Sequence, residues 1–362
     1  MPIQTAIDSI GNSQGSPFGF KNRIINGGMV IDQRNAGGTT TASGSWAVDR
    51  FQFYVTQANK FTAQRDAGSV TPPPGFSNYL GFTSSSAYSV LSSDLFETYQ
   101  IIEGYNWSDM DWGKSTAKSV TLSFWVRSSL TGTFGGVVMN SSQNYNYPYS
   151  YTINSANTWE YKTITVPGAT SGSWLGTYNN CVTVGFLLAA GSQWLTTPGS
   201  WTTSSYHGAT GQTSLVGTNG ATFYITGVQV EKGTQATLFD NRSYSTEMGL
   251  CQRYYYSLTN GANLNQSLGN WTCHSAADAR TQLFFPVQMR IGPSLQQTTG
   301  TNYYRLEGYA GKNFTTLSIA YNTITAALIY NNSELGSSMT AGSSMLAYSN
   351  NASTLVAFNA EF

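Results

Sequence analysis

Charged side chains are scarce in this chain. Asp, Glu, Lys and Arg make up 9% of its 362 residues, compared with about 25% in ordinary globular proteins. Lys plus Arg number 17 and Asp plus Glu number 17, so the formal net charge is zero. This balance excludes the basic field that nucleic-acid binding requires. A neutral polar surface is compatible with a component of a particle that contacts sugars or other subunits. The alternative interpretation is a soluble protein with an unusual surface.

Long apolar runs are absent as well. No stretch reaches the ~18 apolar residues that cross a bilayer, so we expect no membrane insertion. The N-terminal stretch lacks a basic start followed by an apolar block, so we expect no secretory signal. Disorder is excluded for most of the chain, because 40% hydrophobic and 14% aromatic residues give it ample surface to bury.

Cysteine and histidine are rare. Cys181, Cys251 and Cys273 are widely spaced and odd in number, which predicts buried thiols rather than a disulfide framework or a zinc site. His207 and His274 are the only histidines, and neither lies in a metal-ligand spacing. Phosphate-loop, dinucleotide-binding and kinase motifs are also absent. We therefore expect no cofactor and no catalytic residue, and the sequence leaves metal binding undecided.

Alternating apolar residues are the dominant pattern. Val120, Leu122, Phe124 and Val126 alternate with polar or outward positions, which predicts a half-buried strand. Similar patterns occur at residues 163–166 and 182–188. Phe223 and Ile225 occupy one phase and Val228 and Val230 the other, so Gly227 is predicted to lie in a β-bulge. Short strands with Gly-, Asn- and Ser-rich turns predict an all-β protein built as an antiparallel sandwich.

One short helix interrupts the strands. Ser245 is a candidate N-cap, and Met248, Cys251 and Tyr255 share one face at helical spacing. Strand patterns resume near Leu268, with residues 284–290 and 317–328 as the stronger candidates. We predict four parts: an N-terminal docking arm at 1–20, a sandwich domain at 21–242, a helical linker at 243–257 and a smaller β-sandwich domain at 258–362.

The stretch from Ala221 to Tyr256 carries the most specific pattern, ATFYITGVQVEKGTQATLFDNRSYSTEMGLCQRYYY. It resembles a large group of bacteriophage virion proteins in which a jelly-roll domain ends in such a segment. The chain shares other parts of the pattern in the same order: residues 22–34, 49–51, 100–104, 120–127, 157–161, 280–293 and 357–362. Leu238 stands where these proteins usually have proline, and Asp240 where glutamate is frequent. These two departures alter a loop and leave the fold intact.

The resemblance implies a carbohydrate-binding-like jelly roll followed by a C-terminal β-domain. It also implies a structural protein at the surface of a phage particle, usually a tail fibre or minor structural protein, and a homotrimer. Its expected partners are other virion proteins and a host surface polysaccharide. The resemblance leaves open whether the protein sits on the tail or the capsid.

Three groups of residues bear on chemistry. Residues 11–15 match the spacing of a nucleophile elbow, but they lack the flanking strand and helix that this motif requires. Asp109 and Asp111 stand beside two tryptophans, which favours a turn with Asx caps and locally packed tryptophans; calcium binding and glycoside cleavage are the alternatives. Trp194, Trp201 and Tyr206 stand among Gly, Ser and Thr, and flat rings with polar neighbours suit the faces of sugars. The same composition also marks a subunit interface.

These observations together favour a tail fibre or receptor-binding protein that recognises host glycan and breaks no bonds. A capsid decoration protein is the alternative, and a polysaccharide depolymerase is the third hypothesis. Trp194, Trp201 and Tyr206 are the candidate sugar-binding residues.

Overall fold

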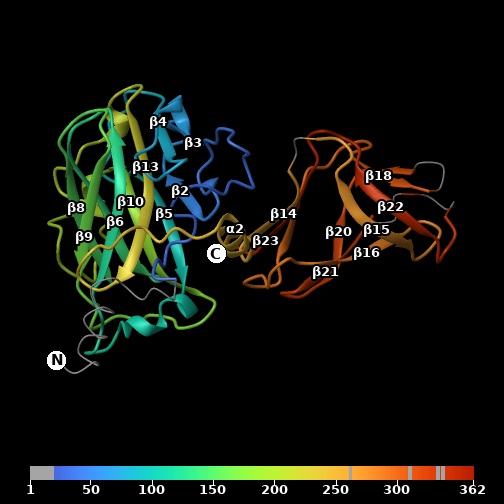
Figure 1. Cartoon of the computed structure of the whole chain (residues 1–362). Coiled ribbons are helices and arrows are strands. Elements are labelled where there is room, and N and C mark those ends of the chain that lie inside the picture. The colour runs from blue at the N-terminus through green and yellow to red at the C-terminus, as the bar shows by residue number, and fades with distance from the viewer. Residues whose placement is uncertain (1–19, 261–262, 309–311, 332–334, 336–338) are drawn as a thin grey trace. The chain divides into compact units, whose positions relative to one another are not determined.

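The computed structural model describes residues 20–260, 263–308, 312–331, 335 and 339–362. These residues form two compact units (Figure 1), the first ending at Tyr244 and the second covering Ser245–Glu361. The predicted docking arm at 1–20 lies outside the described residues, except for Phe20. No helix among the described residues is long and apolar enough to cross a membrane.

The first unit contains two antiparallel sheets. One has six strands in the order β1 (Trp46–Val48), β2 (Phe51–Val55), β5 (Leu95–Glu103), β10 (Asn180–Ala190), β7 (Gly132–Asn140) and β8 (Asn146–Ile153). The other has five strands in the order β3 (Phe61–Arg65), β4 (Leu80–Ser84), β13 (Thr222–Lys232), β6 (Val120–Ser128) and β9 (Glu160–Val166). A short parallel pair joins β11 (Leu195–Thr196) to β12 (Gly208–Ala209).

Aromatic side chains hold the two sheets together. Each of four ring pairs joins the six-stranded sheet to the five-stranded sheet: Phe53–Phe82, Phe61–Phe96, Phe124–Phe186 and Phe134–Phe223. Their centroids lie between 5.0 and 6.1 Å apart, which is the separation of interacting rings. This interdigitated core makes the unit a β-sandwich, as the alternating pattern predicts.

Several local predictions are confirmed. The predicted strand over Val120–Val126 is β6, and all four of its alternating apolar side chains are fully buried. Strand β10 contains the predicted run at 182–188. Gly227 has φ +63°, and the pairing of β13 with β6 shifts between Thr226 and Gln229, which is the predicted bulge. All three cysteines are buried thiols that form no disulfide.

The helix α2 (Tyr244–Gln252) is shorter than predicted. Ser245 lies inside its first turn, and Tyr255 already belongs to strand β14 (Tyr255–Asn260), where it pairs with Asn359. The predicted linker at 243–257 is therefore helical only in its first part. Aromatic residues favour strands, and pairing with the last strand of the unit decides the conformation of Tyr255.

The second unit also contains two sheets. Three strands are ordered β14, β23 (Leu355–Asn359) and β17 (Ser294–Gln297). Seven strands are ordered β19 (Lys312–Phe314), β18 (Tyr304–Glu307), β22 (Ser344–Ser349), β15 (Ser267–Cys273), β16 (Ala279–Phe284), β21 (Ala326–Tyr330) and β20 (Ser318–Asn322). Val356 and Phe358 of the small sheet share one core with Trp271 and Tyr304 of the large sheet, so this unit is a smaller sandwich.

Two strand predictions in the second unit are wrong. Strand β16 ends at Phe284, so residues 285–290 are not a strand; Pro286 has no N–H to contribute to a ladder. Residues 317–328 form a hairpin between β20 and β21 instead of one strand. At its turn, the Thr323 hydroxyl accepts hydrogen bonds from the N–H groups of Thr325 and Ala326, which reverses the chain.

Candidate functional site

A cleft of about 360 Å³ lies on the outer face of the six-stranded sheet, away from the sandwich core. Strand β5 shows how the sequence builds it. Phe96 and Ile102 point into the core, so Glu97, Tyr99 and Ile101 point outward by the period-2 geometry of a strand. The lining residues come from four strands and from the loops above them: Tyr54, Leu95, Glu97, Tyr99, Ile101, Met139, Gln143, Asn180, Thr183, Trp194 and His207.

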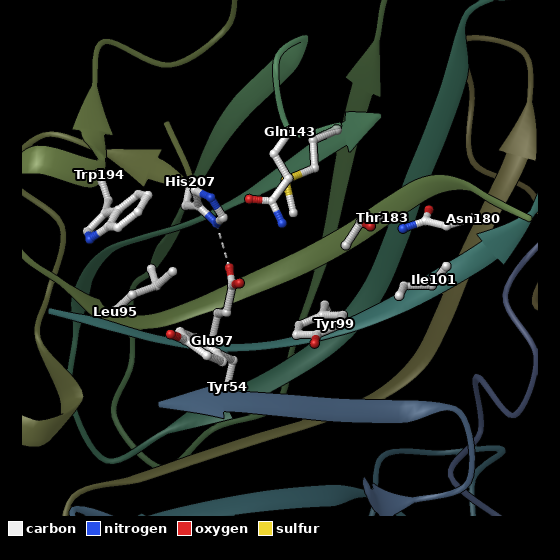
Figure 2. A pocket seen from close by; sticks show the side chains of 11 residues that line it. Tyr54, Leu95, Glu97, Tyr99, Ile101, Gln143, Asn180, Thr183, Trp194 and His207 are labelled. Atoms are coloured by element: carbon white, nitrogen blue, oxygen red, sulfur yellow. Dashed lines mark hydrogen bonds and ion pairs between the residues drawn. The ribbon is translucent and has the colours of Figure 1, made fainter. Parts of the chain in front are cut away.

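Figure 2 shows the arrangement of these side chains. Trp194 and Leu95 lie at one end of the view, and Asn180 and Ile101 lie at the other. Leu95 and Ile101 are six residues apart on one strand, which corresponds to about 20 Å at the rise of a β-strand. The floor is therefore elongated along β5. It combines flat rings with amide, hydroxyl and carboxylate groups.

Glu97 and His207 form the central polar contact of the cleft (Figure 2). The distance between Glu97 Oε2 and His207 Nδ1 is 2.8 Å, and both residues are nearly inaccessible to solvent. The other ring nitrogen, Nε2, lies 3.5 Å from the Ser205 hydroxyl. This contact ties the loop that contains His207 to strand β5.

Trp194 is held as one wall of the cleft. Its indole N–H donates to the Ser93 carbonyl at 2.9 Å, and its ring meets the His207 ring edge-on at 5.2 Å. The backbone N–H of His207 also donates to the Trp194 carbonyl at 2.8 Å. Trp194 is half-buried, so part of its ring remains available to a ligand in a fixed orientation.

Tyr99 contributes a second ring to the floor. Its hydroxyl donates to Gln52 Oε1 at 2.6 Å, which fixes the ring position. Burial, followed by the nearby Glu97 charge, raises the pKa of this phenol well above its ordinary value. Tyr99 therefore stays neutral across the physiological range and acts as a flat ring with a polar edge.

Several polar groups of the cleft make no hydrogen bond among the residues that the structure describes. Asn180 Oδ1 is buried without a partner, and the side-chain amide of Gln143 has none either. Glu97 Oε1 accepts no hydrogen bond within the same part of the chain. A ligand hydroxyl, which both donates and accepts, can pair with the accessible groups among them.

The structure places the three predicted sugar-binding residues differently. Only Trp194 lines the cleft. Trp201 packs in a cluster of aromatic rings: its centroid lies 5.1 Å from that of Tyr145 in a stacked pair, 5.3 Å from that of Trp112 and 5.8 Å from that of Trp174. Tyr206 is half-buried one residue before His207 and is not a lining residue.

The two aspartates near the tryptophans, Asp109 and Asp111, form ion pairs with basic side chains. Asp109 contacts Arg23 at 2.8 Å and Lys232 at 3.5 Å, and Asp111 contacts Lys114 at 2.9 Å. No group of three or more His, Cys, Asp or Glu side chains suited to a metal ion occurs within the described ranges. Both aspartates are thus engaged by basic side chains, and the Trp107 and Trp112 rings pack on each other at 4.8 Å; neither aspartate supplies a side-chain cap to the short 3-10 turn that includes Asp109.

Among the described residues that line the cleft, His207 is the one remaining candidate for chemistry. Ser13 of the elbow-like motif lies outside the described residues. His274 belongs to the second unit, where its side chain is exposed and its Nδ1 lies 3.5 Å from Asp278. His207 alone of the two histidines reaches the cleft, and its contact with Glu97 joins residues 110 positions apart in the sequence.

Comparisons with known proteins give the following likenesses. No protein-family profile and no curated protein matches the chain. Tailspike protein 4 of bacteriophage CBA120, an enzymatically active domain, matches 59% of this chain at 13% identity and a TM-score of 0.34, and the match spans 22% of that tailspike chain. A family 11 carbohydrate-binding module from Clostridium thermocellum, solved with a mixed-linked tetrasaccharide, matches 56% of this chain and 99% of its own at 13% identity and a TM-score of 0.28.

The module TmCBM61, solved with β-1,4-galactotriose, matches 59% of this chain and all of its own, at 11% identity and a TM-score of 0.30. TM-scores below 0.5 at such identities fix neither a family nor a ligand. The chain is a two-unit, all-β protein that is similar, at this level, to carbohydrate-binding modules and to a phage tailspike domain.

Proposed function

We propose that the chain is a structural protein of a bacteriophage particle whose first unit binds a host surface glycan without cleaving it. The observation that carries the binding half is the cleft, where two oriented rings, Trp194 and Tyr99, stand beside acceptors without donors. Sugar rings present C–H faces that pack on aromatic rings and hydroxyls that donate hydrogen bonds. The virion half rests on the sequence pattern at residues 221–256.

The neutral, aromatic surface supports assembly into a particle. Tyr321 and Phe284 of the second unit are 75% and 72% exposed, and Leu238 of the first unit is 89% exposed. Exposed rings and aliphatic side chains of this size are available for contacts with other subunits. We place the protein on the phage surface, as a homotrimer and as a tail component. A capsid decoration protein is the alternative location.

A carbohydrate array tests the binding half. The full chain is applied to bacterial surface polysaccharides together with two variants, Trp194→Ala and Trp159→Ala. Trp159 is the matched control, since it too is half-buried, donates to a backbone carbonyl and meets one ring edge-on. Trp194→Ala should lose binding while Trp159→Ala keeps it. Binding that is absent from every glycan would refute the proposal.

Immunolabelling of intact particles tests the location. Labelled tails support the tail component, labelled heads support the decoration protein, and unlabelled particles would refute a virion role. Gel filtration with light scattering gives the oligomeric state, and a mass of three chains is expected.

Hydrolysis is a second candidate that one contact favours. Ser205, His207 and Glu97 follow the order of nucleophile, base and orienting carboxylate. However, the 3.5 Å between Ser205 Oγ and His207 Nε2 exceeds the usual reach of an activated nucleophile. Glycoside cleavage needs two carboxylates, and Glu97 is the one carboxylate that the described residues contribute to the cleft lining. Release of reducing sugar or acid by the wild type, but not by Ser205→Ala, would establish hydrolysis and refute the adhesion proposal.

A further inference from the structure

We infer that the cleft accepts an uncharged, hydroxyl-rich glycan chain and rejects chains that carry carboxylate, sulfate or phosphate groups. This inference rests on the proposed glycan binding and narrows it to one chemical class. Three features of the lining carry it: its charge, its hydrogen-bonding balance and its length.

The charge of the lining opposes an anion. Among the described lining residues, the ionisable side chains besides tyrosine are Glu97 and His207, and none is a lysine or arginine. His207 Nδ1 lies 2.8 Å from the Glu97 carboxylate, so even a protonated His207 has its charge balanced within the protein. An acidic sugar entering the cleft would lose water beside a carboxylate and gain no cation, which is costly for any buried charge.

The hydrogen-bonding groups of the lining favour a ligand that both donates and accepts. Glu97 Oε1 and Asn180 Oδ1 accept no hydrogen bond within the described part of the chain, and the side-chain amides of Gln143 and Asn180 donate none there. A hydroxyl group can pair with groups of both kinds, whereas an ionised acidic group can only accept. An acidic group placed against Glu97 would leave this acceptor unsatisfied, which weakens binding.

The length of the floor favours a chain over a single sugar. Leu95, Glu97, Tyr99 and Ile101 line about 20 Å of strand β5. Rings stand at the Trp194 end and at Tyr99, and the amide of Asn180 stands at the far end (Figure 2). This spacing fits several sugar units laid along β5.

Matched glycan pairs test the inference. The probes are neutral hexose oligosaccharides of several linkages, each paired with its 6-carboxyl counterpart of the same linkage and length. The wild type should bind at least one neutral member about tenfold or more tightly than its acidic partner. Glu97→Gln keeps the size of the side chain and removes its charge, so it should weaken neutral binding about tenfold and narrow the gap between the partners. Asp111→Asn removes an exposed carboxylate outside the cleft and should change neither value.

Each outcome has one meaning. Equal or tighter binding of the acidic members would overturn the inference and leave the proposed glycan binding intact. Binding of neither member across all linkages would refute the proposed function itself. If circular dichroism shows that Glu97→Gln does not fold, the comparison of neutral and acidic members on the wild type still decides the question.

Discussion

Trp201→Ala separates a packing role from a sugar-binding role for the most prominent ring of the sequence-predicted site. The Trp201 ring stacks on Tyr145 with an interplanar angle of 13° and meets Trp112 and Trp174 edge-on. Its indole N–H donates to the Pro167 carbonyl at 3.0 Å. The substitution removes all of these contacts and leaves a void among rings.

The magnitude follows from these contacts. Replacing a core tryptophan by alanine costs about 3–5 kcal/mol, which includes the cavity. Each aromatic pair contributes about 0.5–1.5 kcal/mol beyond its buried area. Trp201 is half-buried, so the lower end applies, and we expect a loss of roughly 3 kcal/mol. For a unit of this size, that loss lowers the melting temperature by roughly 6–12 °C.

Calorimetry and denaturant titration of the whole chain give the measurement, and glycan-array binding is followed in parallel. Trp159→Ala loses one ring contact and one hydrogen bond, each contributing about 1 kcal/mol, so a loss of about 2 kcal/mol is expected for it. Trp201→Ala should destabilise the first unit more than Trp159→Ala and retain glycan binding below its melting temperature. A variant of normal stability that binds no glycan would refute the packing role and restore Trp201 as a sugar contact.

Three further predictions concern single residues. Gly227→Ala should cost about 2 kcal/mol in denaturant titration, because φ is +63° there and an added Cβ would lie 2.6 Å from the Phe76 ring. Burial acts to raise the pKa of Glu160, but hydrogen bonds from Lys162 and from residues 154 and 155 lower the pKa of this carboxyl to about 2. Because its folded-state pKa is lowered from 4.5, up to about 3 kcal/mol of stability is present above about pH 4.5 and is lost as the pH falls to about 2. The free energy of unfolding, measured by urea titration at several pH values, should therefore depend less on pH in Glu160→Gln than in the wild type across this window. Burial raises the pKa of the Cys181 thiol to about 12, so thiol reagents should label it only after unfolding, and rapid labelling of the native protein would contradict its burial.

The strand framework was predictable because alternation reports burial directly. Val120 to Val126 follow the period of a strand with one face in the core, and the structure confirms it as β6. The phase change at Gly227 likewise predicted the bulge correctly. Such patterns arise from consecutive residues of one strand, so they can be read from the sequence without knowledge of distant contacts.

The cleft was not predictable, because polarity does not distinguish the two faces of strand β5. Gln100 points into the protein, where its amide exchanges two hydrogen bonds of 2.8 Å with the Ile25 backbone. Ile101 is apolar and yet lines the cleft. Alternation of polar and apolar residues normally marks the outer and inner faces of a strand. Here the polar Gln100 faces inward and the apolar Ile101 faces outward, so the alternation does not mark the cleft.

The composition of the loop at 193–207 suggested ring-mediated sugar binding, and tertiary packing then divided its members. Trp194 lines the cleft because its indole N–H reaches Ser93. Trp201 joins a cluster whose other rings come from separate loops and strands. The outcome depends on partners about 90 to 100 positions away, Ser93 for Trp194 and Trp112 for Trp201, and the spacing of residues within the loop cannot report such partners.

The central claim is that the outer face of the six-stranded sheet is the ligand-binding surface. The direct measurement is the shift of the tryptophan indole N–H resonances in a nuclear magnetic resonance titration with the tightest-binding array oligosaccharide. The Trp194 signal should move in proportion to saturation, while the Trp201 and Trp159 signals stay in place. A titration that moves Trp201 or Trp159 and leaves Trp194 unchanged would contradict the placement of the site.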